Sequence, residues 1–255
     1  MSKRFLVVAL ISLSSVHAGR AHSGDEFEKL LLEAKQRLTA AVNQWDEPGL
    51  LEARSLFERL LQNEKWQWLT HYYVGYADYN LAIYYQTRNK KDLALQYLDD
   101  GIAHVEAAVA ARQDFADAHA LLSSLLGQKI GMDPSLGTSL GPQAGTALAE
   151  ALKYGPDNPR VALISALSAY FTPEAFGGSK TRAVQELERA IKLFESETLE
   201  DPRLPDWGHS DAWTWRARFH LDAGEVEQAR KCLERALKVN PESAFARSTK
   251  KWLTK

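Results

Sequence analysis

One helical spacing recurs along this chain and limits what it can fold into. It is a small residue, a large apolar residue four positions on, a second small residue at offset 7 and a proline at offset 12. The two full copies are Ala144, Leu148, Ala151, Pro156 and Ala229, Leu233, Ala236, Pro241. Small residues on one helix face let a second helix approach closely, and the proline ends the helix. The spacing therefore predicts antiparallel helix pairs repeated along the chain.

The clearest copy spans residues 210–241. Trp213 begins its first helix, Ala217 supplies a small residue four positions later, and a glycine then breaks the chain before the second helix. These marks resemble the tetratricopeptide (TPR) repeat, a helical hairpin of about 34 residues. Arg216 and His220 depart from that pattern, since they stand where it has a leucine and a tyrosine.

The same pattern, followed along the chain, predicts an all-α protein without strands. We expect a TPR-like right-handed superhelix of about five helical hairpins with a C-terminal capping helix. The expected helices are 25–45 with 50–63, 66–87 with 91–112, 115–130 with 142–154, 159–171 with 180–196, the pair within 210–241, and the cap Ser243–Leu253. Residues 25–255 would form a single domain. The helix Val161–Phe171 is apolar on nearly every face, so we expect it to be buried at the centre.

The N-terminus has the pattern of a secretory signal peptide. Lys3 and Arg4 precede the apolar run Phe5–Leu13, which is too short to span a bilayer. We expect residues 1–18 to be removed by cleavage after Ala18, with 19–24 as a short linker. The expected location is the periplasm or the exterior of the cell, and no later segment predicts a membrane span.

Charge and motifs exclude several classes of function. Cleavage after Ala18 would leave 29 of the 31 basic residues against 33 acidic ones, a net charge of −4, which disfavours nucleic acid as a partner. The histidines show no metal-binding spacing, although His209 is the most plausible ligand, and no catalytic motif is present. Cys232 cannot form an internal disulfide and is expected to be a buried thiol. We therefore predict no enzyme activity, no metal and no cofactor.

Several short runs in the middle of the chain resemble a family of exported bacterial TPR proteins of unassigned function. They are Trp68-Leu69-Thr70-His71-Tyr72-Tyr73, Asp157-Asn158-Pro159-Arg160, Tyr170-Phe171-Thr172-Pro173-Glu174-Ala175-Phe176-Gly177-Gly178 and Pro205-Asp206-Trp207-Gly208. The resemblance covers residues 45–210. More distantly, the chain is similar to the periplasmic TPR components of TRAP-type transporters. The first resemblance implies a secreted helical repeat without known chemistry, and the second implies a ligand-linked role.

Aromatic residues concentrate at 66–85, more than one core-facing helix stripe needs. We expect packing between helices to account for these rings, and a partner-binding groove is the alternative, because tyrosine also suits recognition surfaces. The loop 172–179 should be ordered, with Phe176 buried beside these tyrosines. The candidate binding residues are Tyr72, Tyr76, Tyr79, Asn80, Phe176, Trp207, Asp211, Trp215 and Arg218.

These observations favour a non-enzymatic periplasmic TPR scaffold that binds a protein or peptide in the cell envelope. The alternative is a solute-binding accessory component of an envelope transport system. A peptide binder needs an open elongated groove, whereas a solute binder needs a pocket that encloses a small ligand. The sequence identifies neither the partner nor the oligomeric state.

Overall fold

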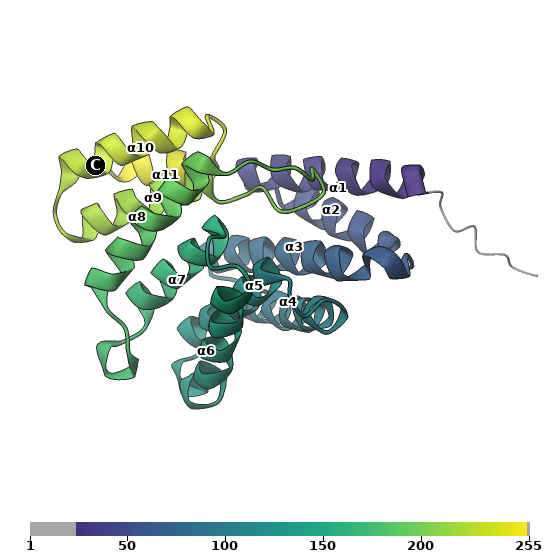
Figure 1. The fold of residues 1–255 in the computed structure, drawn as a ribbon. Coiled ribbons are helices and arrows are strands. Elements are labelled where there is room, and N and C mark those ends of the chain that lie inside the picture. Colours follow the sequence, from purple (N-terminus) through teal and green to yellow (C-terminus); the bar gives the residue numbers. More distant parts are fainter. Residues whose placement is uncertain (1–23, 254–255) are drawn as a thin grey trace, which may run out of the picture.

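The computed structural model describes residues 24–253, and this part of the chain consists of eleven α-helices, three short 3-10 helices and no strand (Figure 1). The expected signal peptide, residues 1–18, lies outside the described residues. The helices are α1 (Gly24–Gln44), α2 (Glu47–Leu60), α3 (Gln67–Thr87), α4 (Lys91–Ala111), α5 (Ala116–Met132), α6 (Gly137–Tyr154), α7 (Pro159–Phe171), α8 (Lys180–Ser196), α9 (His209–Asp222), α10 (Val226–Val239) and α11 (Ala244–Trp252). The 3-10 helices are η1 (Glu64–Trp66), η2 (Pro134–Leu136) and η3 (Glu174–Phe176).

Consecutive helices pair as predicted. α1 packs on α2, α3 on α4, α5 on α6, α7 on α8 and α9 on α10, and α11 covers the last pair. The five hairpins stack into a TPR-like right-handed superhelix with a C-terminal capping helix, which confirms the predicted fold class. Small residues make the close approach possible: a Cβ added to Gly75 of α3 would lie 2.4 Å from the side chain of Val105 on α4.

The third hairpin differs from its prediction at one end. α6 begins at Gly137 rather than at residue 142, so Pro142 lies inside the helix. Asp133 caps the preceding η2, where its side chain accepts a hydrogen bond from the Ser135 N–H, and the chain passes directly from η2 into α6. The predicted long turn is therefore mostly helical.

Helix α7 is buried over most of its length, as its apolar sequence predicts. Val161, Leu163 and Ala166 are almost completely buried. The C-terminal end differs, because Phe171 is 61 % exposed. The expectation of burial on all sides is wrong at this end, where the hairpin extends beyond its neighbours.

The segment between α8 and α9, residues 197–208, crosses back over the first two hairpins, and we call it the strap (Figure 1). The buried Lys35 of α1 holds it: Lys35 Nζ donates hydrogen bonds to the carbonyl oxygens of Pro202 and Leu204, each at 2.7 Å. The same ammonium lies 2.9 Å from a carboxylate oxygen of Asp206. Lys35 therefore holds the strap at the turn 201–204, through two of its backbone carbonyls.

Helix α3 holds the rest of the strap. The Tyr73 hydroxyl donates a hydrogen bond to the Arg203 carbonyl at 2.6 Å. Trp207 Nε1 donates to the Tyr72 hydroxyl at 2.8 Å, and the Trp207 ring stacks on Tyr76 with centroids 4.9 Å apart. Trp207 packs against three of the four buried apolar clusters among the described residues. It is the side chain through which the N-terminal and C-terminal halves share a core.

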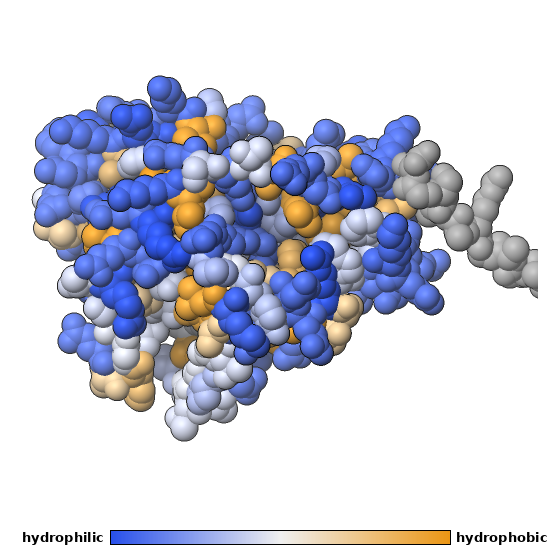
Figure 2. All heavy atoms as spheres, viewed as in Figure 1, coloured by the Kyte–Doolittle hydropathy of each residue, from blue (hydrophilic) through white to orange (hydrophobic). Residues whose placement is uncertain are grey.

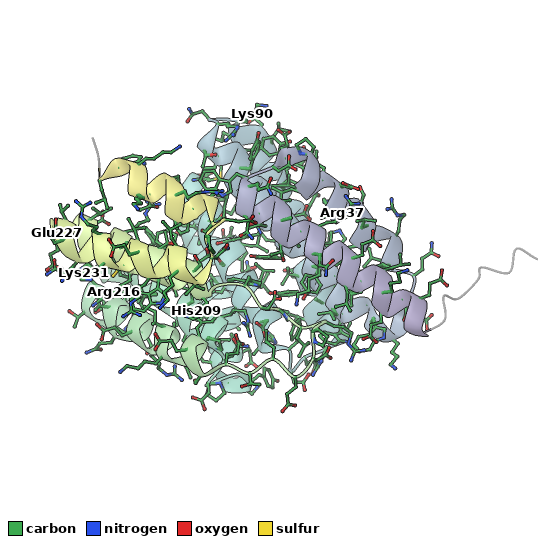
Figure 3. The ribbon with its side chains drawn as sticks, turned by 90° about the horizontal axis from the view of Figure 1, so that it is seen from above. Arg37, Lys90, His209, Arg216, Glu227 and Lys231 are labelled. Atoms are coloured by element: carbon green, nitrogen blue, oxygen red, sulfur yellow. The ribbon has the colours of Figure 1, made fainter. Side chains whose placement is uncertain are left out.

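The two ends of the superhelix also meet. Asn240 Nδ2 donates a hydrogen bond to Asn43 Oδ1 at 2.7 Å, and Arg247 donates one to the Asn43 carbonyl at 3.4 Å. Figure 3, seen from above, shows α11 next to α1. The superhelix is thus closed on itself by contacts between its last helices and its first.

Candidate functional site

Most of the tyrosines on α3 belong to the core. Tyr72 is 0 % exposed and Tyr76 is 6 % exposed, and burial raises the pKa of both hydroxyls well above 10. The packing alternative holds for these two residues, because their partner is Trp207, 135 residues away in the chain from Tyr72. Spacing within α3 could not reveal this, since the ring that covers the tyrosines comes from a distant loop.

The expected burial of Phe176 is wrong. Its side chain is 81 % exposed at the tip of the α7–α8 hairpin, where Figure 2 shows apolar atoms open to solvent at the lower left. The loop is nevertheless built as expected: Ser179 caps α8, and Gly177 has a φ of 90° that favours glycine. The tip projects beyond the neighbouring hairpins, so no apolar surface is there to cover Phe176. The idea that Phe176 and the α3 tyrosines form one site is dropped.

An aromatic surface does remain partly exposed where α7, α9 and α11 meet. We call it the aromatic patch: Phe171 of α7, Trp215 and Arg218 of α9, and Phe245 of α11. The Trp215 ring meets Phe171 edge to face at 5.5 Å and Phe245 at 5.3 Å between centroids. The Arg218 guanidinium lies 4.9 Å from the Trp215 ring centroid. Trp215 and Phe245 are half-buried, whereas Arg218 is exposed.

Sequence reasoning identified two members of this patch and missed two. Trp215 and Arg218 are three positions apart in α9 and therefore share one face of that helix. Phe171 and Phe245 are the last residue of one helix and the second residue of another. The exposure of Phe171 could have been predicted from the sequence, because an apolar residue at the end of a helical hairpin has few neighbours to cover it. Nothing in the sequence places Phe245 beside Trp215, since that contact depends on how the capping helix docks.

Asp211 lies on the same face of α9, one turn before Trp215. Burial raises the pKa of Tyr76 and of Tyr79, and the negative charge of Asp211 adds to the rise. The side chain is half-buried, and burial raises its own pKa to about 6. Among the described residues, no hydrogen bond or ion pair compensates this carboxylate. It lies in the first turn of α9, where the free backbone N–H groups and the helix dipole favour an acidic side chain.

Tyr79 and Asn80 border the same inner surface and are half-buried. The Tyr79 hydroxyl accepts a hydrogen bond from Ser124 of α5 at 3.4 Å. Asn80 Nδ2 bonds back to the Tyr76 carbonyl at 2.7 Å, within its own helix. Gln128 of α5 has a buried Oε1 without a hydrogen-bond partner in the described part of the chain.

The strongly perturbed charged groups elsewhere have structural roles. Arg160 of α7 is buried and donates to Asp117 of α5 at 2.6 Å and to Glu197 at the start of the strap at 2.5 Å. Arg54 of α2 bonds the fully buried Asp78 of α3 at 2.5 Å, and burial raises the Asp78 pKa to about 7 although Arg54 opposes the shift. These pairs join neighbouring hairpins, and Arg160 and Glu197 also line an open surface cavity of about 340 Å³.

The residues considered for metal or thiol chemistry are placed as follows. His209 stacks on Phe194 at 5.5 Å, and its buried Nε2 has no hydrogen-bond partner among residues 24–253. Within that range no group of three or more metal-ligating side chains is present. Cys232 is buried, as predicted, and burial raises its pKa.

Across the described helices, none has the length and apolar character that crossing a membrane requires.

Comparison with known proteins supports the fold. Residues 210–250 match the family described as "Tetratricopeptide repeat". The HusA haemophore from Porphyromonas gingivalis is similar in structure, with a TM-score of 0.63 and 21 % identity over 80 % of this chain and 94 % of that one. A thermophilic TPR protein from Thermus thermophilus is similar with a TM-score of 0.56 and 17 % identity over 87 % and 98 % of the two chains. No curated protein matches the sequence. The protein carries a TPR repeat on a TPR-type fold.

Proposed function

We propose that the protein is a non-enzymatic scaffold of the cell envelope that binds a segment of a partner protein or a peptide through the aromatic patch. One observation carries this: Phe171, Trp215 and Phe245 form contiguous, partly exposed rings across α7, α9 and α11. Large rings with little conformational entropy are typical of binding hot spots. The inner side of a TPR-type superhelix is also the concave surface that such repeats use for binding.

The strap reduces the surface of the superhelix that is free to bind a partner. It already covers the inner side of α1 and of the first turns of α3, where Lys35 and Tyr73 bind its backbone carbonyls. The surface left for a partner is therefore the C-terminal part, from Tyr79 and Asp211 to the aromatic patch. Export to the periplasm belongs to the proposal and rests on the signal-peptide pattern of residues 1–18.

The aromatic patch also favours a second candidate, a flat apolar ligand. Three rings beside one guanidinium suit a planar molecule with an acidic substituent, and the similarly folded HusA is described as a haemophore. This would correspond to the solute-binding alternative. We rank it second because two open cavities among the described residues lie away from the patch. One of about 340 Å³ is lined by Arg160 and Glu197, and one of about 790 Å³ is lined by residues of α1.

Two measurements separate these functions. Peptides selected from a randomised library on the wild-type protein should bind at least tenfold more weakly to Trp215→Ala and Arg218→Gln, since hot-spot truncation costs about 2 kcal/mol. Haemin titration, followed by its absorbance spectrum, should show no Trp215-dependent binding. Saturable haemin binding that Trp215→Ala abolishes, without any peptide enrichment, would favour the flat ligand instead.

A further inference from the structure

Arg218 lies over two aromatic rings and has no hydrogen-bond acceptor among the described residues. Its guanidinium carbon is 4.9 Å from the Trp215 ring centroid and 5.9 Å from that of Phe245. Elsewhere in residues 24–253, each arginine that lies over a ring also donates a hydrogen bond to an oxygen of the chain: Arg54, Arg88, Arg112, Arg160 and Arg203. Arg218 therefore differs from them in having donors that the described chain does not use.

The two rings restrict the position of this guanidinium and offer no acceptor oxygen or nitrogen to its N–H groups. Arg218 is exposed, so a ligand can reach those N–H groups from solvent. A planar guanidinium matches a carboxylate, which can accept two of its N–H groups at once. The geometry therefore favours an anionic group of a ligand over a cationic or neutral one.

No carboxylate of the described chain competes for Arg218. Asp222, one turn further along α9, accepts a hydrogen bond from the Tyr170 hydroxyl at 2.6 Å and forms no ion pair with Arg218. On the other side of Trp215, the exposed ring of Phe171 lies 5.5 Å from the Trp215 ring centroid. Apolar rings thus continue from the guanidinium through Trp215 to Phe171, so a positive charge and an apolar surface are presented together.

We propose that Arg218 selects bound segments that carry an acidic side chain close to a large apolar one. The inference rests on the proposed function and adds the class of partner: the acidic side chain would bond Arg218, and the apolar one would lie on Trp215 and Phe171. A carboxylate bonded to the outer edge of Arg218 would lie further from Trp215 than the guanidinium carbon, which is at 4.9 Å. A separation of two positions in an extended segment, about 7 Å, fits this arrangement.

The test compares acidic peptides with their amide forms. Peptides are selected from a randomised library on the full wild-type chain, and each is then synthesised again with its Asp and Glu residues replaced by Asn and Gln. Acidic residues should be enriched two positions from an apolar residue. The acidic form should bind the wild-type protein about tenfold more tightly than the amide form, and about 0.5 M NaCl should reduce this preference by screening the charges.

Two arginine variants locate the preference. Arg218→Gln should bind both forms equally, because it removes the charge and keeps a polar side chain. Arg88→Gln is the matched control, since Arg88 also lies over a ring, at 3.9 Å from the Tyr84 centroid, and it should keep the full preference. Arg218 makes no hydrogen bond within the described residues, so Arg218→Gln should fold normally, and circular dichroism checks this.

Equal affinity of the acidic and amide forms for the wild-type protein, or a preference that survives in Arg218→Gln, would overturn the inference. The proposed function is read separately, from the loss of amide-form binding in Trp215→Ala. Binding that needs Trp215 but shows no charge preference would leave the peptide site standing and remove the acidic requirement. A selection that yields no Trp215-dependent peptide would overturn the proposed function and this inference together.

Discussion

Trp207 shows how much of this fold depends on single side chains in a loop. It lies in a segment without regular structure, yet it touches three apolar clusters and bonds Tyr72. Gly208 makes its position possible: the residue has a φ of 110°, and a Cβ there would lie 2.6 Å from the Phe194 ring. The sequence run Pro205–Gly208 is therefore explained by packing.

We expect Trp207→Ala to lower the free energy of unfolding by about 3 kcal/mol, because it empties a shared core position and leaves the buried Tyr72 hydroxyl unpaired. Urea unfolding followed by circular dichroism measures this. Trp252→Ala is the matched control, since that ring is 79 % exposed, and it should change stability by less than about 0.5 kcal/mol. Equal effects of the two substitutions would mean that Trp207 is no core residue.

The helix pairs agree closely with the sequence prediction where the contacts are between residues that are near one another in the chain. The bounds of α7 and α8 match the predicted ranges, and Ala229, Leu233 and Ala236 of α10 are all buried, in agreement with the repeat spacing. What the spacing could not predict depends on contacts between distant segments. The covering of Tyr76 by the strap and the docking of Phe245 on Trp215 are both of this kind, so the candidate site was predicted only in part.

The α9–α10 contact gives a direct test of the repeat register. Ala229 is 0 % exposed, so Ala229→Leu should destabilise the protein by about 1–3 kcal/mol through overpacking. Gln228→Leu, at the exposed neighbouring position of the same helix, should have little effect. Differential scanning calorimetry measures the Tm of both variants. An unchanged Tm for Ala229→Leu would show that the repeat register is wrong.

The α3–α4 pair contains two histidines whose Nδ1 atoms are 2.9 Å apart, His71 and His104. Burial lowers the pKa of both, and His71 and Arg54 lower that of His104 further, against Glu58 and Asp100. The folded protein therefore binds protons at these histidines less readily than the unfolded chain does, where their pKa is about 6.5. The free energy of unfolding is therefore unaffected by these two groups above pH 6.5, and it decreases as the pH falls below that value. His71 and His104 place one part of this loss at the α3–α4 interface, and His209 of α9, whose pKa burial also lowers, adds another.

Removing one histidine should weaken that pH dependence. Between pH 7.5 and pH 5.5, we expect the wild-type protein to lose more unfolding free energy than His104→Gln does, because the variant has one fewer group that binds a proton on unfolding. Chemical denaturation at the two pH values supplies the comparison. Parallel losses in the two proteins would show that the pair does not resist protonation.

At the scale of the whole molecule, the strap and the contact between the two ends couple hairpins that an open repeat array would leave independent. Repeat proteins normally contact only their neighbours and unfold in parts. Here Lys35 binds residues more than 160 positions away, and Asn43 binds Asn240. We therefore expect residues 24–253 to unfold as one cooperative unit.

Lys35→Met tests the strap. It removes two charge-assisted hydrogen bonds and the pair with Asp206 while keeping the apolar stem, so a loss of about 2 kcal/mol is expected. Hydrogen exchange should become faster over residues 201–208, while α10 remains protected. The exposed pair Arg37–Glu52 offers a control, because Arg37→Met should leave strap exchange unchanged. Unaltered exchange in Lys35→Met would show that the strap is held by other contacts.

The central claim is that partners bind at the aromatic patch while the tyrosines of α3 serve the core. The most direct measurement is the affinity of a library-selected peptide for the wild-type protein, Trp215→Ala, Arg218→Gln and the control Trp252→Ala, with folding checked by circular dichroism. We predict at least a tenfold loss for the two patch variants, no change for Trp252→Ala, and unaltered helical content throughout. Wild-type affinity in folded Trp215→Ala and Arg218→Gln would contradict the account.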